Sequence, residues 1–242
     1  MANPTPIQHF AQIDSTNTKC VELAKTGTPG PVWVLADVQT QGRGRRGREW
    51  KSGTGNLYAS GLYWFEHPPA RLAELSFAAA LAIADTLANT IASDALQLKW
   101  PNDVLLEGVK LAGILPESGI KDGRGWLVMG IGINLAHAPV LPDRGTACVG
   151  DYLGPGRKLP TPAMVLPQLI QSFEDWVARW EQDGFDPLRR AWVARAFGLG
   201  QKITTSDGHS GTFEDMSKNG ALLLRKASGQ AIEISAGEVF FP

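Results

Sequence analysis

The most chemically distinctive part of the sequence is the segment at residues 42–51, Gly-Arg-Gly-Arg-Arg-Gly-Arg-Glu-Trp-Lys. It places five cationic side chains and one carboxylate among three glycines, although the whole chain has a formal net charge of only -1. Arginine binds carboxylate or phosphate oxygens in pairs through its planar guanidinium group, and glycine lets backbone N–H groups approach a ligand closely. The segment therefore predicts a loop that wraps a small anion. The alternatives are a solvated basic loop and a chance run of the nuclear-localisation type.

Three further segments carry residue types that suit a carboxylate or a nucleotide. Residues 99–104, Lys-Trp-Pro-Asn-Asp-Val, place two short oxygen-bearing side chains in a proline turn, where magnesium or hydroxyl ligands are often found. Residues 110–115, Lys-Leu-Ala-Gly-Ile-Leu, begin with a cation, and residues 130–135, Gly-Ile-Gly-Ile-Asn-Leu, place two glycines in an apolar strand. Such glycines weaken a strand unless something approaches closely. Taken singly, these segments are equally compatible with a plain turn, a solvated lysine and a weakened strand.

The elements around these segments form a mixed α/β pattern. Ser15, Thr16 and Asn17 can cap a helix that follows them, and runs of β-branched and aromatic residues indicate strands before and after the basic loop. Apolar residues recur every three or four positions from Leu75 to Ile91, which predicts an amphipathic helix whose other face carries small and polar residues. We expect strands at residues 10–13, 32–38, 57–65, 96–100, 110–115 and 126–135, and helices at residues 18–25 and 72–91.

The pattern changes near residue 197. Thr161-Pro162 is typical of a helix start, with proline at the first helical position, and a second helix is expected at residues 187–197. Asp-Gly, Asn-Gly and Ser-Gly pairs, which signal hairpins, then separate short strand candidates. These candidates are residues 202–205, 210–214, 221–225, 231–234 and 239–241. We therefore expect a large domain at residues 1–197 and a small β-barrel at residues 198–242.

Composition excludes several classes of protein. The 242 residues are 43% hydrophobic and 19% charged, as in an ordinary globular chain, and no stretch has the pattern of a signal peptide or a membrane span. Cys20 and Cys148 suit free thiols in a reducing cytoplasm, and the four histidines lack the spacing of a zinc site. The sequence pI is about 6.4, which disfavours a nucleic-acid binder.

The chemistry-bearing segments, taken in order with Ser15-Thr16-Asn17 and Gln39, resemble the biotin-protein ligase family. The resemblance covers nearly the whole chain, including the two helices after residue 160 and the small C-terminal barrel. The joint match of the arginine loop, the Lys-Trp-Pro-Asn-Asp turn and the Lys-Leu-Ala-Gly-Ile-Leu strand is specific. It implies a mixed-sheet α/β (α+β) catalytic domain, at residues 1–197, with an SH3-like barrel at residues 198–242. Lipoate ligases share this fold, but we do not expect them to share the arginine loop.

The resemblance also implies where biotin binds. The ureido ring of biotin needs matched donors and acceptors within an apolar pocket, and hydroxyl and amide side chains supply them. Its valerate carboxylate needs cations. The implied biotin-binding residues are Ser15, Thr16, Asn17, Gln39, Arg43, Gly44, Arg45, Lys110, Gly113 and Gly132.

A nucleotide site next to the biotin site is implied as well. Arg45 and Lys110 would hold the biotin carboxylate and the α-phosphate of ATP together, and Arg48 would help to order the loop over the adenylate. The implied catalytic residues are thus Arg45, Lys110 and Arg48. The implied nucleotide-binding residues are Arg45, Arg48, Trp50, Asn102, Lys110 and Asn134, with Asp103 as a magnesium ligand.

The implied reaction has two steps. Biotin and ATP form biotinoyl-5'-AMP and pyrophosphate, and a lysine ε-amine of a biotin carboxyl carrier protein or domain then attacks the mixed anhydride and releases AMP. Because this anhydride hydrolyses in water, we expect the arginine loop to act as a lid that is disordered when empty and closes on ligand.

Three rival functions remain to be separated from this one. A lipoate or octanoyl transfer enzyme would need a long apolar slot, and a biotin-binding module would not need so many phosphate-directed groups. A nucleic-acid binder would need a more basic surface. Only fourteen residues precede Ser15, too few for a helix-turn-helix domain. We therefore expect no DNA binding, no membrane association and a cytoplasmic location, and a homodimer remains open.

Overall fold

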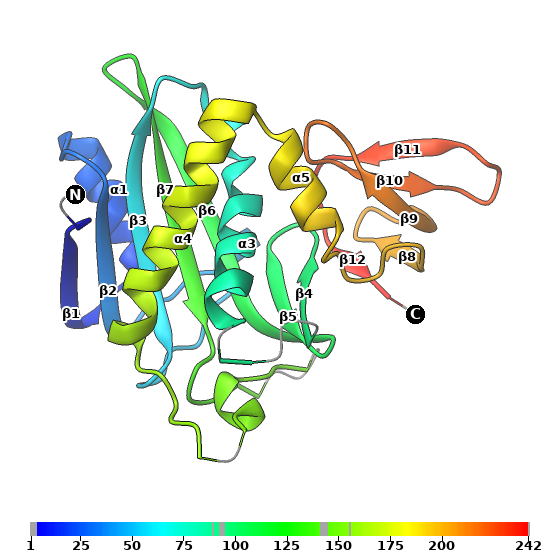
Figure 1. The fold of residues 1–242 in the computed structure, drawn as a ribbon. Helices are drawn as coiled ribbons and strands as arrows, with labels where there is room; N and C mark the ends of the chain where they lie inside the picture. The colour runs from blue at the N-terminus through cyan, green and yellow to red at the C-terminus, as the bar shows by residue number, and fades with distance from the viewer. Residues whose placement is uncertain (1–3, 89, 92–94, 141–144, 155, 242) are drawn as a thin grey trace.

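The larger part of the protein is built on one mixed sheet of seven strands (Figure 1). The computed structural model describes residues 4–88, 90–91, 95–140, 145–154 and 156–241. The strand order is β1-β2-β3-β7-β6-β5-β4; β1 and β2 pair in parallel, and all other neighbours pair antiparallel. The expected mixed-sheet class is therefore confirmed. The strands are β1 (Ile7–Ile13), β2 (Val32–Gln39), β3 (Leu57–Phe65), β4 (Leu96–Lys99), β5 (Asp103–Leu106), β6 (Val109–Lys121) and β7 (Arg124–Ile133).

Helices cover both faces of this sheet. Helix α1 (Thr16–Thr26) packs on one face, where Cys20 and Ala24 join Val32 and Val34 in a small apolar cluster. As expected, Ser15 is the N-cap of α1, and its side chain accepts a hydrogen bond from the Thr18 amide. On the other face lie α3 (Leu75–Leu87) and α4 (Pro162–Asp183), side by side, with α5 (Asp186–Val193) at their end (Figure 1).

The expectation of one amphipathic helix at residues 72–91 is wrong in two respects. A short helix, α2 (Pro69–Leu72), precedes α3, and every residue of α3 except Asp85 is buried. The reason is tertiary: α3 packs against the sheet, against α4 beside it and against α5, so its alanine-rich side faces another helix instead of water. The carboxylate of Asp85 accepts hydrogen bonds from Trp176 of α4 and from Arg195, which follows α5.

Two other expectations need correction. Strand β5 is not among the expected strands, because Asn102 and Asp103 in the proline turn have the composition of a loop. The turn in fact joins β4 and β5 in a hairpin, in which Lys99 pairs with Asp103. The helix expected at residues 187–197 ends at Val193. The chain leaves the helix there because Leu98 of β4 pairs in parallel with Ala196, so backbone hydrogen bonds to β4 replace the helical ones.

The remaining strands form a second, antiparallel sheet in the segment expected to be a small β-barrel, and β9 contacts α5 of the larger part. The strand order of this sheet is β11-β10-β9-β8-β12. One apolar core runs through both parts, and Trp100 donates a hydrogen bond to the Gly220 carbonyl at 3.0 Å across the junction. Phe241, which follows the last strand, lies beside Lys99 at the end of β4. These strands are β8 (Lys202–Thr205), β9 (Ser210–Met216), β10 (Leu222–Arg225), β11 (Ala231–Ile234) and β12 (Val239–Phe240).

Both cysteines are free, as the sequence predicts, and both are buried. Burial raises the pKa of the Cys20 thiol to about 12, and its Sγ lies 3.2 Å from the Ser60 carbonyl oxygen. The thiol therefore stays protonated and acts as a small apolar side chain. Among the described residues, no helix is long and apolar enough to cross a membrane.

Removing Phe173 should destabilise the protein strongly. This side chain is fully buried between α4 and the sheet, with ring centroids 6.3 Å from Trp33 and 5.4 Å from Tyr63. We expect Phe173→Ala to lower the free energy of unfolding by about 3–5 kcal/mol, because it leaves a cavity in the core. Met164 lies on the same helix and is 60% exposed, so Met164→Ala should change that free energy by under about 0.5 kcal/mol. Urea unfolding followed by tryptophan fluorescence measures both, and similar losses would contradict this account of the core.

Candidate active site

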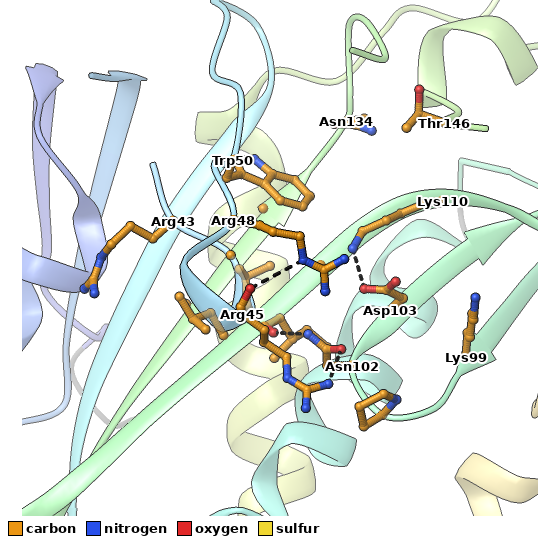
Figure 2. A pocket seen from close by; sticks show the side chains of 18 of the residues that line it. Arg43, Arg45, Arg48, Trp50, Lys99, Asn102, Asp103, Lys110, Asn134 and Thr146 are labelled. Atoms are coloured by element: carbon orange, nitrogen blue, oxygen red, sulfur yellow. Dashed lines mark hydrogen bonds and ion pairs between the residues drawn. The ribbon is translucent and has the colours of Figure 1, made fainter. Parts of the chain in front are cut away.

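One cavity brings the chemistry-bearing segments together. It has a volume of about 660 Å³ and lies between the larger sheet, the basic loop and the end of the second sheet (Figure 2). All fifteen residues singled out from the sequence line it. They are Ser15, Thr16, Asn17, Gln39, Arg43, Gly44, Arg45, Arg48, Trp50, Asn102, Asp103, Lys110, Gly113, Gly132 and Asn134.

A neutral polar cluster forms one end of the cavity. Ser15, Thr16 and Asn17, at the start of α1, are only 2%, 3% and 4% exposed. Gln39 Oε1, at the end of β2, accepts hydrogen bonds from the Thr16 amide at 2.8 Å and from Thr16 Oγ1 at 3.1 Å. Ser60 Oγ lies 2.8 Å from Thr16 Oγ1 and is fully buried. Sequence reasoning missed Ser60, although a serine inside an otherwise apolar strand was the signal.

The basic loop, residues 42–51, connects β2 to β3, and its two ends lie next to each other. Its base is held by a hydrogen bond from the Trp50 amide to the Gly42 carbonyl at 2.8 Å, and Arg43 pairs with Glu49 in an antiparallel bridge. A single 3-10 turn, Arg45–Gly47, forms the tip. The backbone thus directs successive arginines toward different parts of the site.

Trp50 occupies the surface that the two strand glycines leave open. A Cβ atom on Gly113 would lie 2.8 Å from Trp50 Cζ3, and one on Gly132 would lie 2.6 Å from Trp50 Cε2. The close approach expected at these glycines is therefore made by the indole ring, which becomes a wall of the cavity. Trp50 Nε1 is buried and has no hydrogen-bond partner among the described residues.

The opposite end of the cavity is charged. Lys110 Nζ lies 2.5 Å from Asp103 Oδ1, and both side chains are less than one-fifth exposed (Figure 2). Arg45 donates to Asn102 Oδ1 at 3.1 Å, while Asn102 donates to the Ile114 carbonyl at 2.6 Å. Burial lowers the pKa of the Arg45 guanidinium below its ordinary value. The charged forms of Arg45 and Lys110 are thus aligned by neighbours and partly withdrawn from water, where their attraction for an anion is strengthened.

Residues close to the C-terminus complete the charged end. Arg48 forms an ion pair with Glu238, and Arg45 donates to the Gly237 carbonyl at 3.5 Å. Phe240 and Phe241 of the same segment also line the cavity. Sequence reasoning missed these residues because no local pattern connects them to a loop about 190 positions earlier in the chain.

Two predicted residues are placed differently from the rest. Arg43 points away from Arg45, Asn102 and Lys110 (Figure 2), and its guanidinium group contacts Glu117 at 3.3 Å. Asn134 is 3% exposed and donates to the Ala147 carbonyl at 3.1 Å, so its amide group holds the loop that follows β7.

Asn56 anchors that loop as well, and the sequence did not single it out. Its Oδ1 accepts hydrogen bonds from three successive amides, those of Leu135, Ala136 and His137, at 2.9, 2.9 and 3.2 Å. Its Nδ2 donates to the His137 carbonyl at 2.8 Å. The side chain of Asn56 therefore stabilises the backbone that carries Asn134.

The charged end suits magnesium only in combination with a nucleotide. Among the described residues no group of three or more His, Cys, Asp or Glu side chains could hold a metal ion. Mg²⁺ often binds one or two carboxylates and takes its other ligands from phosphates and water. Asp103 can supply one such oxygen, and Lys110 already contacts that carboxylate.

Comparison with known proteins agrees with this architecture. The sequence model of the Biotin/lipoate A/B protein ligase family matches residues 9–134, and that of the Biotin protein ligase C terminal domain matches residues 200–241. The fold and the two-ended cavity thus define a ligase of the biotin/lipoate class. The biotin protein ligase from Aquifex aeolicus in complex with biotin and ATP has the same fold, with a TM-score of 0.80, 24% sequence identity and 97% of each chain covered.

Sequence relatives define the family more closely. The biotin--[acetyl-CoA-carboxylase] ligase of Paracoccus denitrificans is 42% identical over 96% of this chain and 99% of its own length. The bifunctional ligase/repressor BirA of Escherichia coli is 32% identical over 88% of this chain and 67% of its own length. The chain belongs to the biotin protein ligase family.

Adding a methyl group at Gly132 should loosen the basic loop. Because the new Cβ would lie 2.6 Å from the Trp50 ring, the indole must move, and the loop loses packing next to its base. We expect Gly132→Ala to speed tryptic cleavage within residues 43–48 by about tenfold, which corresponds to about 1.4 kcal/mol of local stability. Gly154→Ala is the matched control, since nothing lies within 4 Å of a Cβ atom there. Equal cleavage rates in the two variants would contradict the role of Trp50 as a wall held by the glycines.

Proposed function

We infer that this chain is an ATP-dependent biotin-protein ligase. It converts biotin and ATP to biotinoyl-5'-AMP and pyrophosphate, and then transfers biotin to a lysine of a biotin carboxyl carrier protein or domain. The observation that carries this inference is the continuity of one cavity of about 660 Å³ between a neutral polar end and a charged end. Two ligands require such a pair of neighbouring subsites: a heterocycle that carries a carboxylate tail, and a nucleoside triphosphate.

The neutral end suits the ureido ring of biotin. Ser15, Thr16 and Gln39 offer hydroxyl and amide groups, and the ring carries one carbonyl acceptor and two N–H donors. The amide of Gln39 is oriented by Thr16, so its unused N–H groups face a defined direction. We propose that the carboxylate tail then runs along the Trp50 wall toward Arg45 and Lys110.

The charged end suits the meeting of two anions. In the first step a biotin carboxylate oxygen attacks the α-phosphorus of ATP, the new P–O bond forms, and pyrophosphate leaves. Arg45 and Lys110 offset the repulsion between the carboxylate and the phosphate and stabilise the charge on the phosphoryl oxygens. Magnesium, bound to the phosphates with Asp103 as a protein ligand, would neutralise the departing pyrophosphate.

The same groups protect the product of that step. In the second step the lysine amine attacks the carbonyl carbon of the anhydride, an amide forms, and AMP leaves. We propose that the loop at residues 42–51, with Arg48 and Trp50, covers the adenylate and limits its hydrolysis. Asn102 and Asn134 would border the nucleotide.

Further expectations concern domains and partners. We propose that residues 1–197 carry out catalysis and that residues 198–242 assist from the mouth of the cavity, where Glu238 and Phe240 lie. The need for ATP supports a cytoplasmic location. Absence of DNA binding stays a prediction, testable by a mobility-shift titration at low salt, and a homodimer is testable by sedimentation.

The decisive assay offers the protein biotin or lipoate, together with ATP, magnesium and a biotin carboxyl carrier domain. Product mass distinguishes the two modifications, and AMP release reports turnover. A biotinylated carrier supports the proposal. Lipoylation would favour the transfer enzymes of the same fold, whereas biotin binding without AMP release would favour a binding module.

Lys110→Gln should nearly abolish adenylate formation. The substitution removes the charge that pairs with Asp103 and that we assign to the phosphate, and a hydrogen-bonded charge of this kind is worth about 1.5–3 kcal/mol or more at a reacting centre. We expect ATP–pyrophosphate exchange to fall by at least about a hundredfold, while a thermal melt shows an intact fold. Near-normal exchange would exclude a catalytic role for Lys110.

Arg45→Ala should weaken retention of the adenylate more than binding of biotin. Arg45 donates hydrogen bonds to Asn102 and to the Gly237 carbonyl at the charged end, away from the polar cluster at the neutral end. The escape of biotinoyl-5'-AMP, timed without carrier, should accelerate by about tenfold or more, and biotin affinity measured by calorimetry should change less. An unchanged escape rate would show that Arg45 does not hold the adenylate.

A further inference from the structure

Glu117 lies where the neutral end of the cavity meets the basic loop. It is on β6, two residues after the stretch that the sequence singled out, and its side chain is 31% exposed. Its Oε2 accepts a hydrogen bond from Asn17 Nδ2 at 2.8 Å and one from Arg43 Nη2 at 3.3 Å. One carboxylate oxygen therefore contacts both α1 and the loop.

The side chain of Asn17 is fully engaged within the protein. Its two amide hydrogens are directed to the Leu115 carbonyl at 3.0 Å and to Glu117, and its Oδ1 lies 2.6 Å from Ser60 Oγ. A Cβ atom on Gly130 would lie only 2.0 Å from Asn17 Oδ1, so glycine is required beneath it. Asn17 consequently positions Ser60, whose Oγ also lies 2.8 Å from Thr16 Oγ1.

Arg43 is engaged on the other side of Glu117. Besides the ion pair with Glu117, its Nη2 donates to Thr18 Oγ1 at 3.4 Å, so it is tied to the first turn of α1. Arg45 and Arg48 of the same loop instead point to Asn102 and Glu238. Arg43 is thus the arginine that fastens the loop to the neutral end.

We propose that Glu117 is a positioning residue that couples the basic loop to the polar end of the cavity, through Arg43 on one side and Asn17 on the other. The proposal rests on the proposed function, in which that end receives the ureido ring of biotin and the loop covers the adenylate. The coupling means that one carboxylate contributes both to the hydrogen-bond geometry around Thr16 and to closure of the loop.

Two substitutions separate the two halves of this role. Glu117→Gln keeps an oxygen that can accept from Asn17 but removes the charge that pairs with Arg43. It should accelerate the escape of biotinoyl-5'-AMP about three- to fivefold, the size expected for a partly exposed ion pair, and leave KM for biotin within about twofold. Glu117→Ala removes both contacts, so KM for biotin should also rise about tenfold, because the buried Asn17 amide loses its acceptor, while kcat changes less.

A double-mutant cycle tests whether Glu117 acts through Arg43. The escape rate in Glu117→Gln plus Arg43→Gln should be no greater than in the more affected single variant, because residues that share one interaction are not additive. Glu66→Gln is the matched control, since Glu66 pairs with Arg124 on the exposed surface of the same sheet. It should match the wild type in every assay.

A substrate-free measurement keeps this inference separate from the proposed function. Tryptic cleavage of the empty protein within residues 45–48 should be about three- to fivefold faster in Glu117→Gln than in Glu66→Gln, whether or not the protein biotinylates a carrier. Equal cleavage, additive escape rates in the cycle, or an unchanged KM for biotin in Glu117→Ala would each overturn the coupling. Thermal melts confirm that the variants are folded.

Discussion

The concentration of positive charge at residues 42–51 is the constraint on which the rest of the site depends. Arginines this close together repel one another, and Arg43, Arg45 and Arg48 are each held by a partner within the protein. The partners come from three different places: Glu117 on β6 holds Arg43, Asn102 in the β4–β5 turn holds Arg45, and Glu238 before β12 holds Arg48. The loop is thereby spread over the whole length of the cavity.

Because one of these partners, Glu238, belongs to the C-terminal part of the chain, the second sheet takes part in the site. The carboxylate that meets Arg48 lies directly before the last strand of the chain, and one apolar core runs through both parts of the protein. This shared core fixes the position of Glu238 relative to the basic loop.

Much of this architecture could be predicted from the sequence, since local patterns specify local structure. Strand β3 and strands β8 and β11 lie at the expected residues, and the cap at Ser15 is as expected. The errors arose where tertiary packing overrides local pattern: α3 has an alanine-rich side that suits solvent, but α4 covers it, and α5 ends early because Leu98 of β4 pairs with Ala196.

For the site, the sequence by itself determined the residue types and their grouping in a few short segments, because the chemistry of anion and ureido recognition requires particular side chains at short spacing. Only the tertiary structure decided which groups meet. It brought Glu238 to the cavity and placed Ser60 and Glu117 behind the residues that line it, against Thr16 and Asn17. It also turned Arg43 away from Arg45 and placed Trp50 against Gly113 and Gly132. These contacts join strands, a turn and a terminal segment distant in the chain, and their geometry depends on sheet order and register, which no local pattern encodes.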